Sequence, residues 1–322
     1  MIDITMLIVT RNSSKYIKSS IESLIKQGYK KEEYEIIIVD GMSDDDTVEI
    51  AKNYLNSQNI NYKIIKNPSK TLAAGWNLGI KNSQGKYIVR VDAHAELLDS
   101  YVKIGVKKLQ SDKNIGAVGG VLITKSQNYL GKMIAKVLSN PIGVGNSLFR
   151  IGIKKDVFTD TAVYAVYKKE VFKKIGLFNE NLDRNQDIDL HKRMLKKGYK
   201  ILTTPQMRAV YYNRTTMKKF IEQAFKNGFW VVYGKSGHFR HLAPLFFVLG
   251  ILLSFLIPQL TLLLVSFYTI VVILFYIFKS QEKNILNLIV LSILTFLLHI
   301  SYGIGSIFGF FKLIEEKIKA VL

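Results

Sequence analysis

Polar side chains that could bind a phosphorylated ligand follow three apolar runs in the first hundred residues, at the point where each run ends. They are Thr10 and Arg11 after the first run, Asp40 after the second, and Asp92 and His94 after the third. Ligands of open α/β sheets bind beyond the carboxyl ends of the strands, so we expect these side chains to meet at one edge. A carboxylate and an imidazole can hold a divalent cation, and arginine can neutralise phosphate, although each residue alone is also typical of a turn.

Two more carboxylates, Asp187 and Asp189, occupy the first turn of a helix predicted to run from about residue 187 to Gly198. A carboxylate at this position can act as a general base, cap the helix, or offset the helix dipole. For Asp187 the alternatives are a proton acceptor and an N-cap. For Asp189 they are binding of an acceptor molecule and compensation of the dipole.

Short β-branched or aromatic runs alternate with helical periods over the first ninety residues. The predicted strands are residues 4–9, 35–39, 62–66 and 87–91, and helical stripes fall at 17–25 and 48–55. This alternation predicts an α/β fold with a mostly parallel, Rossmann-like sheet. Residues 124–157 are rich in Gly, Ser and Asn and show no clear period, as is typical of functional loops. A strand at 161–166 and a helix at 168–175 follow.

Charged residues are concentrated before residue 244 and apolar residues after it. Of the 45 Lys and Arg, 40 precede residue 244, as do 22 of the 25 Asp and Glu, whereas residues 244–278 hold no charged side chain. Residues 284–311 contain no Asp, Glu, Lys or Arg, and His299 is their single side chain that titrates near neutral pH. Uncharged runs this long predict a helical transmembrane region over 244–322, with two spans, or three if the chain breaks at Pro258.

The segment between these parts, residues 216–243, has apolar residues at helical spacing opposite several lysines. We expect an amphipathic helix in the membrane interface, with a helix packed on the preceding domain as the alternative. Residues 1–215 then form the catalytic domain. The chain begins without the basic and apolar regions of a signal peptide, so we expect this domain to face the cytoplasm.

Composition excludes several classes of protein. The sequence has no cysteine and 48% hydrophobic residues, which excludes a disulfide-stapled secreted module and a disordered chain. The basic residues are not accompanied by zinc-finger spacing or by the aromatic motifs of RNA-binding domains, so nucleic acid is not an expected partner. Anionic lipid and phosphorylated substrates fit the charge better.

Several ordered motifs are similar to those of family 2 inverting glycosyltransferases with a GT-A fold, and together they cover about residues 3–215. They are IVTRN at 8–12, VDGMSDDDT at 39–47, the helix at 71–79, GKYIVRVDAH at 85–94, GLFNE at 176–180 and NQDIDL at 185–190. Two departures stand out, since His94 replaces the last aspartate of the D-x-D motif and Gln186 replaces the glutamate before the base. The sequence around both positions resembles that of a subgroup that includes succinoglycan-type polysaccharide glucosyltransferases.

The resemblance implies a role for each of the residues described above. It implies that Asp187 is the catalytic base, and that Asp189 binds the acceptor. It implies a nucleotide site in which Asp40 accepts a hydrogen bond from the uracil ring and Thr10, Arg11 and Asp92 take part. Lys70 and Arg90 are further candidates for this site, where they would neutralise phosphate, with a solvated surface charge as the alternative for each. The resemblance also implies a divalent metal, preferably Mn2+ and otherwise Mg2+, held by Asp92 and His94. The alternatives for His94 are a hydrogen bond to phosphate and a surface turn.

The expected reaction transfers one sugar from a nucleotide sugar, with UDP as the expected nucleotide, to a polyprenyl-diphosphate-linked glycan. Its product would serve the synthesis of a capsule, exopolysaccharide or other cell-surface polymer. The alternatives are transfer to polyprenyl phosphate itself and a non-catalytic membrane scaffold that binds nucleotides or translocates lipids. A Q-x-x-R-W motif is not reproduced around Gln223 and Trp230, which disfavours processive synthesis. The expected location is the cell membrane, as a multi-pass protein.

Overall fold

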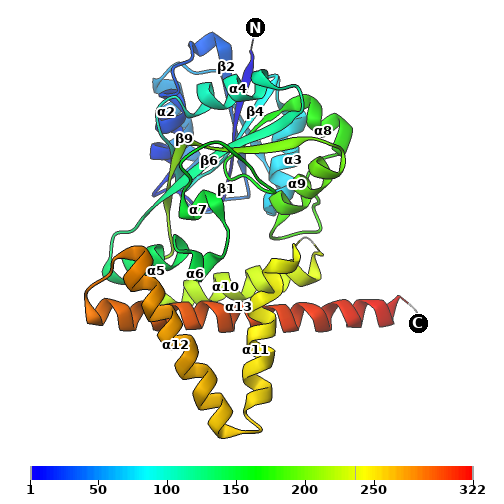
Figure 1. Ribbon diagram of the computed structural model, residues 1–322. Coiled ribbons are helices and arrows are strands. Elements are labelled where there is room, and N and C mark those ends of the chain that lie inside the picture. Colours follow the sequence, from blue (N-terminus) through cyan, green and yellow to red (C-terminus); the bar gives the residue numbers. More distant parts are fainter. Residues whose placement is uncertain (1, 236, 321–322) are drawn as a thin grey trace. The chain divides into compact units, whose positions relative to one another are not determined.

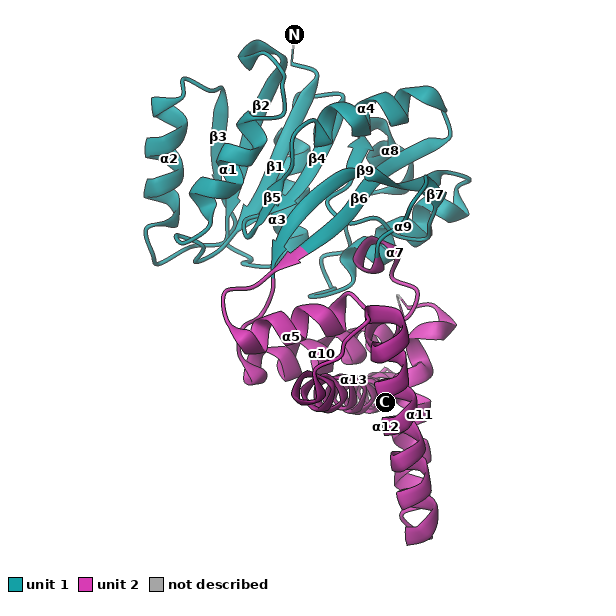
Figure 2. Cartoon of the chain, turned by 60° about the vertical axis from the view of Figure 1, so that its left-hand side comes forward, with its two compact units in different colours: residues 1–123, 152–212 teal, residues 124–151, 213–322 magenta. Residues whose placement is uncertain are grey.

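The computed structural model describes residues 2–235 and 237–320, and the chain folds into two compact units (Figure 2). The first unit consists of residues 1–123 and 152–212, and the second of residues 124–151 and 213–322. Residues 124–151, which the sequence analysis placed in the catalytic domain without assigning their structure, therefore group with the C-terminal helices.

The first unit is built on one mixed sheet with the strand order β3-β2-β1-β4-β8-β6-β9-β5, and β7 pairs with β9 (Figure 1). Its strands are β1 (Ile4–Thr10), β2 (Tyr34–Asp40), β3 (Tyr62–Lys66), β4 (Tyr87–Asp92), β5 (Ala95–Leu97), β6 (Ile115–Lys125), β7 (Val157–Phe158), β8 (Val166–Lys168) and β9 (Lys200–Tyr212). The first four strands are parallel, as predicted, and β8 joins β4 in antiparallel pairing. Every residue of β1 and β2 is buried, which fits β-branched strands covered on both faces.

Helices connect the parallel strands, namely α1 (Ile17–Ile25), α2 (Thr47–Ser57) and α3 (Leu72–Asn82), with a 3-10 turn η1 (Lys31–Glu33) before β2. The antiparallel part of the sheet is accompanied by α4 (Tyr101–Ser111), α8 (Lys169–Ile175) and α9 (Gln186–Lys196). The Thr71 side chain accepts a hydrogen bond from the Ala74 N–H and so caps α3. Gly176 and Gly198 follow α8 and α9 with φ of 81° and 80°, a left-handed conformation that favours glycine.

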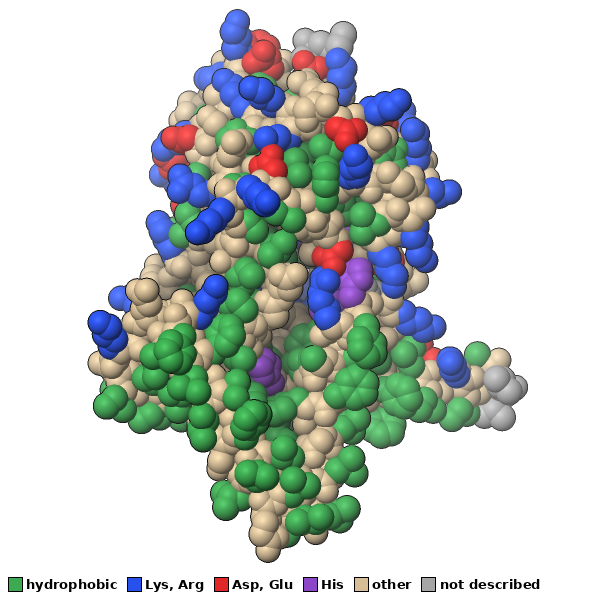
Figure 3. Space-filling view, in the orientation of Figure 1, with side chains coloured by type: hydrophobic (Ala, Val, Ile, Leu, Met, Phe, Trp, Pro, Cys, Tyr) green, Lys and Arg blue, Asp and Glu red, His purple; other side chains and the backbone are tan. Residues whose placement is uncertain are grey.

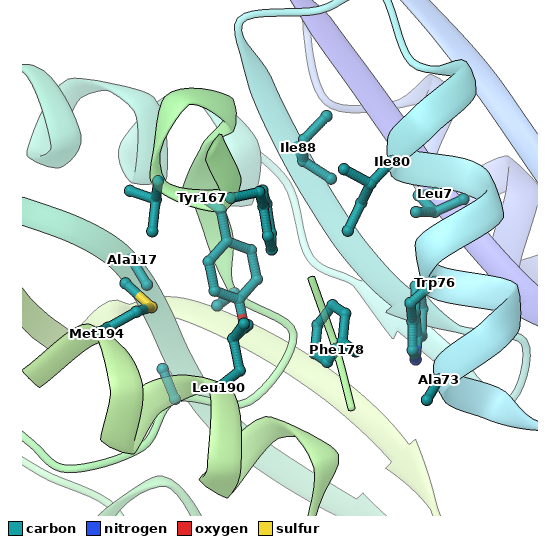
Figure 4. Close-up of a cluster of buried hydrophobic side chains, with 14 of the residues drawn as sticks. Leu7, Ala73, Trp76, Ile80, Ile88, Ala117, Tyr167, Phe178, Leu190 and Met194 are labelled. Atoms are coloured by element: carbon teal, nitrogen blue, oxygen red, sulfur yellow. The ribbon is translucent and has the colours of Figure 1, made fainter. Parts of the chain in front are cut away.

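A cluster of buried apolar side chains joins α3, β8 and α9 (Figure 4). Trp76 of α3 lies beside Phe178, and Leu190 and Met194 of α9 pack on the same cluster near Tyr167 of β8. These contacts fix α9 against the sheet from the side opposite its polar residues. The first turn of α9, which carries Asp187 and Asp189, is thereby held in place.

The second unit is helical. Its elements are α5 (Tyr129–Leu138), α6 (Pro141–Val144), α7 (Leu148–Ile151), α10 (Met217–Tyr233), the 3-10 turn η2 (Phe239–Leu242), α11 (Ala243–Ser254), α12 (Pro258–Ser280) and α13 (Ile285–Lys319). Of the two arrangements that the sequence left open, the structure has the one with a break at Pro258, because this proline is the first residue of α12. Among the described residues, α12 and α13 are the two helices long and apolar enough to cross a membrane.

Candidate active site

Three of the predicted ligand-binding residues end adjacent parallel strands. Thr10 at the end of β1 is in register with Asp40 at the end of β2, and Val9 is in register with Asp92 at the end of β4. Arg11 follows Thr10 directly, so these four residues share one edge of the sheet. This is the carboxyl edge, where open α/β sheets bind ligands.

The loop after β2 is closed by Asp40. The Asp40 carboxylate accepts hydrogen bonds from the Ser43 N–H at 3.0 Å and from the Ser43 hydroxyl at 2.5 Å. Ser43 Oγ in turn accepts the N–H of Asn12 at 2.9 Å, which ties the loops after β1 and β2 together. Asp40 is therefore partly engaged within the protein, and its contact with a uracil ring remains a prediction.

Arg90 is a buried cation two residues before Asp92 on β4. Its guanidinium lies 3.6 Å from Asp187 Oδ2 and over the rings of Trp76 and Phe178, at 4.9 and 5.8 Å from their centroids. Burial alone would lower the pKa of Arg90, but the Asp187 and Asp92 carboxylates outweigh it and raise the pKa above its usual value. Arg90 thus stays charged and links β4 to the start of α9. Its predicted contact with phosphate remains untested.

Asp187 lies in the first turn of α9 without being its N-cap. The N-cap is Asn185, which has a left-handed backbone and makes no side-chain cap. Asp187 Oδ1 accepts the N–H of Ile188 at 2.9 Å, while Oδ2 faces Arg90. The carboxylate is 29% exposed, so it can meet a substrate from solution.

Asp189 has a partner of its own on α9. The Arg193 Nε and Nη2 groups both donate to Asp189 Oδ2, at 3.0 and 2.9 Å, and Arg193 also donates to the carbonyls of Ile175 and Leu177. This network ties α9 to the end of α8. It gives Asp189 a structural task, while its predicted contact with the acceptor remains untested.

Asn77 on α3 is a positioning residue to which the sequence analysis assigned no role. Its side-chain amide donates to the Phe178 carbonyl at 2.9 Å and to Glu180 at 2.7 Å, and its oxygen accepts the Phe178 N–H at 2.9 Å. Asn77 thereby fixes the loop that leads to Asp187. An asparagine within a helix gives no sequence signal for contacts a hundred residues away.

His191 is a fully buried histidine one turn after Asp187, and it too was absent from the predicted site. Its Nε2 lies 2.9 Å from the Tyr167 hydroxyl, and its Nδ1 lies 3.0 Å from the Thr161 hydroxyl. Burial lowers the pKa of His191 to about 4, since the nearby Asp187 carboxylate opposes this shift only in part. The imidazole is therefore neutral at pH 7, and its contacts with Tyr167 and Thr161 hold α9 one turn after Asp187.

We predict that His191 makes the fold sensitive to acid. The unfolded histidine takes up its proton near pH 6.5, whereas the folded one resists protonation down to about pH 4, so stability falls as the pH drops between these values. The loss at pH 5 is about 2 kcal/mol. Thermal unfolding of the detergent-solubilised chain between pH 7.5 and 5 measures it. His191→Gln should flatten this pH dependence, and an unchanged dependence would contradict the assignment.

The remaining predicted residues, Lys70 and His94, lie in the turns that follow β3 and β4. Lys70 is exposed in the turn after β3, with φ of 57°, and nothing in its surroundings distinguishes it from a solvated charge. His94 lies in the turn between β4 and β5, and its ring centroid is 5.5 Å from that of Tyr211. Their predicted roles in phosphate and metal binding remain predictions.

Five of the fourteen buried side-chain atoms that lack a hydrogen-bond partner among the described residues lie near Asp187 or at the strand ends. These five are Thr10 Oγ1, Arg90 Nε, Asp92 Oδ1, Asn185 Nδ2 and Gln186 Nε2, whereas others, such as Ser20 Oγ and Gln223 Oε1, belong to helices away from this edge. Folded proteins rarely leave such groups unpaired. The convergence of these five on the carboxyl edge and the N-terminus of α9 indicates a site that binds a polar ligand.

Asp92 is the residue best suited to hold a metal ion here. One of its oxygens is buried and unpaired, which suits a hard cation such as Mg2+ or Mn2+. Residues 2–235 and 237–320, however, contain no cluster of three or more His, Asp or Glu side chains that could hold a metal ion. Asp92 therefore fits a cation that would take its remaining ligands from water or from a bound molecule.

The parallel sheet, its polar carboxyl edge and the carboxylate of α9 define an α/β domain with a candidate ligand site at the carboxyl ends of its strands. The chain belongs to glycosyl transferase family 2, whose model matches residues 5–176. It has the GT-A fold of solved glycosyltransferases. The family and fold predicted from the sequence motifs are thus confirmed.

Two relatives show how far the likeness extends. A dolichyl N-acetyl-α-D-glucosaminyl phosphate 3-β-D-2,3-diacetamido-2,3-dideoxy-β-D-glucuronosyltransferase of Methanococcus voltae is 32% identical over 93% of this chain and 95% of its own length. The succinoglycan biosynthesis protein ExoA of Rhizobium meliloti is 27% identical over 67% of this chain and 65% of its own length.

Solved structures extend the likeness in fold. A mannosyltransferase from Pyrobaculum calidifontis, solved with GDP-Man and Mn2+, matches 94% of this chain and 86% of its own, with a TM-score of 0.63 and 15% identity. TarS of S. aureus, solved with UDP-GlcNAc, matches 70% of this chain and 65% of its own, with a TM-score of 0.51 and 18% identity.

Proposed function

We propose that this chain is an inverting glycosyltransferase that adds one sugar from a UDP-sugar to a sugar already carried by a polyprenyl phosphate or diphosphate. The observation that carries the proposal is the set of buried, unpaired polar atoms around Asp187 and the strand ends. A nucleotide sugar brings phosphate oxygens, a base and several hydroxyls, which supply donors and acceptors to such atoms. Membership of glycosyl transferase family 2 supports the transferase class.

Asp187 is the proposed general base. Its carboxylate accepts the proton of the acceptor hydroxyl as that oxygen attacks the anomeric carbon. The bond from this carbon to the diphosphate oxygen breaks on the opposite face, and the leaving nucleoside diphosphate keeps the electron pair. One displacement inverts the configuration and requires no covalent sugar–enzyme intermediate.

Two features of the site would assist this displacement. A bound divalent cation, by preference Mn2+, would neutralise the charge that develops on the leaving diphosphate, and Asp92 with His94 would hold it. Arg90 Nη1 lies 3.6 Å from Asp187 Oδ2, and its guanidinium packs on the rings of Trp76 and Phe178. The base is therefore positioned before the substrate arrives.

A lipid-linked acceptor accounts for a glycosyltransferase with long apolar helices. The relative from Methanococcus voltae carries the name of a dolichyl-linked sugar phosphate, and it aligns with nearly the whole of this chain. In that name the acceptor is a sugar carried by the lipid. This favours transfer to a lipid-linked sugar over transfer to polyprenyl phosphate itself. We place the reaction at the cytoplasmic face of the cell membrane, in the assembly of a cell-surface polysaccharide.

The experiment uses the full chain in detergent with Mn2+. Thermal shifts with UDP-N-acetylglucosamine, UDP-glucose, UDP-glucuronate and GDP-mannose first identify the donor, because a bound donor raises the unfolding midpoint. The radiolabelled donor is then offered with polyprenyl phosphate or with a polyprenyl-linked sugar, and the lipids are extracted. We expect label in lipid only with the sugar-bearing acceptor. Label with polyprenyl phosphate would support the alternative transferase, and binding without turnover would support a scaffold.

A further inference from the structure

Within the second unit, α11 and α12 form a hairpin with an apolar, exposed turn. The turn residues Phe255, Leu256 and Ile257 are 60%, 83% and 54% exposed, and charged residues are absent between 244 and 278. Figures 1 and 2 both show the hairpin extending away from α10 and α13. Its visible surface in Figure 3 is free of Lys, Arg, Asp and Glu. Such a surface fits lipid hydrocarbon better than water.

The N–H groups of the turn are paired within the chain. The N–H groups of Phe255, Leu256 and Ile257 each donate to the carbonyl three residues earlier, at 2.9–3.3 Å, and Pro258 has no N–H to satisfy. The Ser254 hydroxyl is also paired, with the carbonyl of Ile251. Internal pairing of this kind is what a turn needs in order to lie inside a bilayer, where water cannot replace missing bonds.

The first arm of the hairpin is too short to cross a bilayer. Helix α11 has 12 residues and is therefore about 18 Å long, against a hydrocarbon core of about 30 Å. The turn that follows it holds large apolar residues instead of the polar residues expected at the far surface. Helix α12 has 23 residues, but its last third is buried against α13 at Val272 and Tyr276. The part from Pro258 to Val272 is about 21 Å long, close to the length of α11 and likewise shorter than the hydrocarbon core. The hairpin therefore ends within the hydrocarbon.

The second arm returns to the side from which the first one enters. The junction of α12 and α13 is bound to α5 and to the start of α6 by three polar contacts, which are Tyr129 with Asn287 at 2.7 Å, Asn140 with Ser280 at 2.7 Å, and Lys136 with Glu282. Residues 124–151 are joined to the first unit at both ends and carry Lys125, Lys132, Lys136 and Arg150. This segment cannot cross the membrane, so the junction must stay on the side of the catalytic unit.

Helix α13 is packed along α10, so the two helices must lie at the same depth in the membrane. Gly305 and Gly309 bring α13 against the backbone of α10, where added Cβ atoms would lie 2.1 and 2.5 Å from the carbonyl oxygens of Phe225 and Phe229. The Ser306 hydroxyl also donates to the Gly228 carbonyl. The outer face of α10 carries exposed Lys218, Lys219, Glu222 and Lys226, which a spanning α13 would draw into the hydrocarbon.

The exposed side of α13 is apolar along most of the helix. Its exposed residues recur on one face from the first turn to the last, as Ile289, Ile293, Ile304, Phe308, Phe311 and Ile318. With 35 residues, α13 is about 52 Å long, well beyond the hydrocarbon thickness. One continuous apolar stripe on so long a helix fits a helix that lies in the plane of the interface.

We propose that α11 and α12 form a re-entrant hairpin that enters and leaves the bilayer on the side of the catalytic unit, while α10 and α13 lie in the membrane interface. The partner of this surface is the hydrocarbon of one leaflet, flanked by headgroups at Arg240 and Lys279. The inference rests on the membrane attachment in the proposed function, but not on the transfer reaction. It replaces the expected multi-pass arrangement with a one-sided one.

Single cysteines test this topology cleanly, because the natural chain has none. The variants Lys52→Cys in α2, Lys283→Cys in the α12–α13 junction and Lys317→Cys in α13 all replace exposed side chains, and Leu256→Cys marks the hairpin turn. Full-length variants in a bacterial host are treated with a charged, impermeant maleimide in inverted membrane vesicles and in intact spheroplasts. N-ethylmaleimide, which crosses membranes, serves as the accessibility control.

We expect Lys52→Cys, Lys283→Cys and Lys317→Cys to react in inverted vesicles and to lose that reaction in spheroplasts. Leu256→Cys should react with neither reagent in either preparation, because a thiol in hydrocarbon stays protonated, and should react with N-ethylmaleimide once the protein is unfolded in detergent. Labelling of Lys283→Cys or Leu256→Cys in spheroplasts would show that the hairpin crosses the membrane, and labelling of Lys317→Cys there would show that α13 does. Release of the protein by an alkaline wash would also overturn the proposal. None of these results depends on sugar transfer, so failure of the topology is distinguishable from failure of the proposed reaction.

Discussion

Replacing Asp187 with asparagine is expected to lower the rate of sugar transfer at least about a hundredfold, while donor binding changes by no more than a few-fold. Asparagine keeps the shape of the side chain and the contact with the Ile188 N–H, but it cannot accept the proton of the acceptor hydroxyl. The neighbouring Arg90 also loses its charged partner, so the variant should be checked for folding by its thermal midpoint. Turnover with saturating UDP-sugar and lipid acceptor is the measurement.

Asp183→Asn is the matched control for this variant. Asp183 is an exposed carboxylate four residues before the proposed base, and we expect its replacement to leave turnover close to wild type. If Asp187→Asn retained near wild-type turnover as well, the base would lie elsewhere. Asp189 would then be the first candidate, despite its ion pair with Arg193.

Asp92→Asn is expected to lower Mn2+-dependent transfer at least about a hundredfold, because the site would lose the carboxylate that shares a cation with the leaving diphosphate. The unpaired, buried oxygen of Asp92 is the structural reason for this expectation. Transfer is measured as a function of Mn2+ concentration, and then with Mg2+. The exposed carboxylate Asp99, seven residues later, provides the control Asp99→Asn, which should titrate like wild type.

His94→Ala separates the two predicted ligands in the same titration. A rise in the Mn2+ concentration needed for half-maximal transfer would assign His94 to the cation together with Asp92. An unchanged titration would leave Asp92 and the diphosphate as the ligands. A normal Mn2+ response from Asp92→Asn would contradict a metal site at the end of β4.

The parallel half of the sheet could be predicted because local sequence determines it. Short β-branched runs became β1 to β4 nearly residue for residue, and the polar residues after them ended on one edge because parallel strands place their carboxyl ends together. The break at Pro258 followed from the missing N–H of proline.

The contacts that complete the site could not be predicted in this way. Arg90 meets Asp187, and Asn77 meets Phe178, across about a hundred residues of chain, and nothing near either residue in the sequence encodes its partner. The grouping of residues 124–151 with the C-terminal helices has the same cause. Met133, Ile134 and Val137 of α5 are buried against residues of α10, α12 and α13, more than eighty positions later.

The configuration of the new glycosidic bond tests the central claim most directly. The lipid product formed by the full chain from an α-linked UDP-sugar and a polyprenyl-linked sugar is extracted, and its anomeric proton coupling is measured by NMR. A single attack assisted by Asp187 predicts one added sugar in the β configuration, and no such product from Asp187→Asn. An α-linked product, or label that never enters the lipid, would contradict an inverting transferase that acts on a lipid-linked sugar.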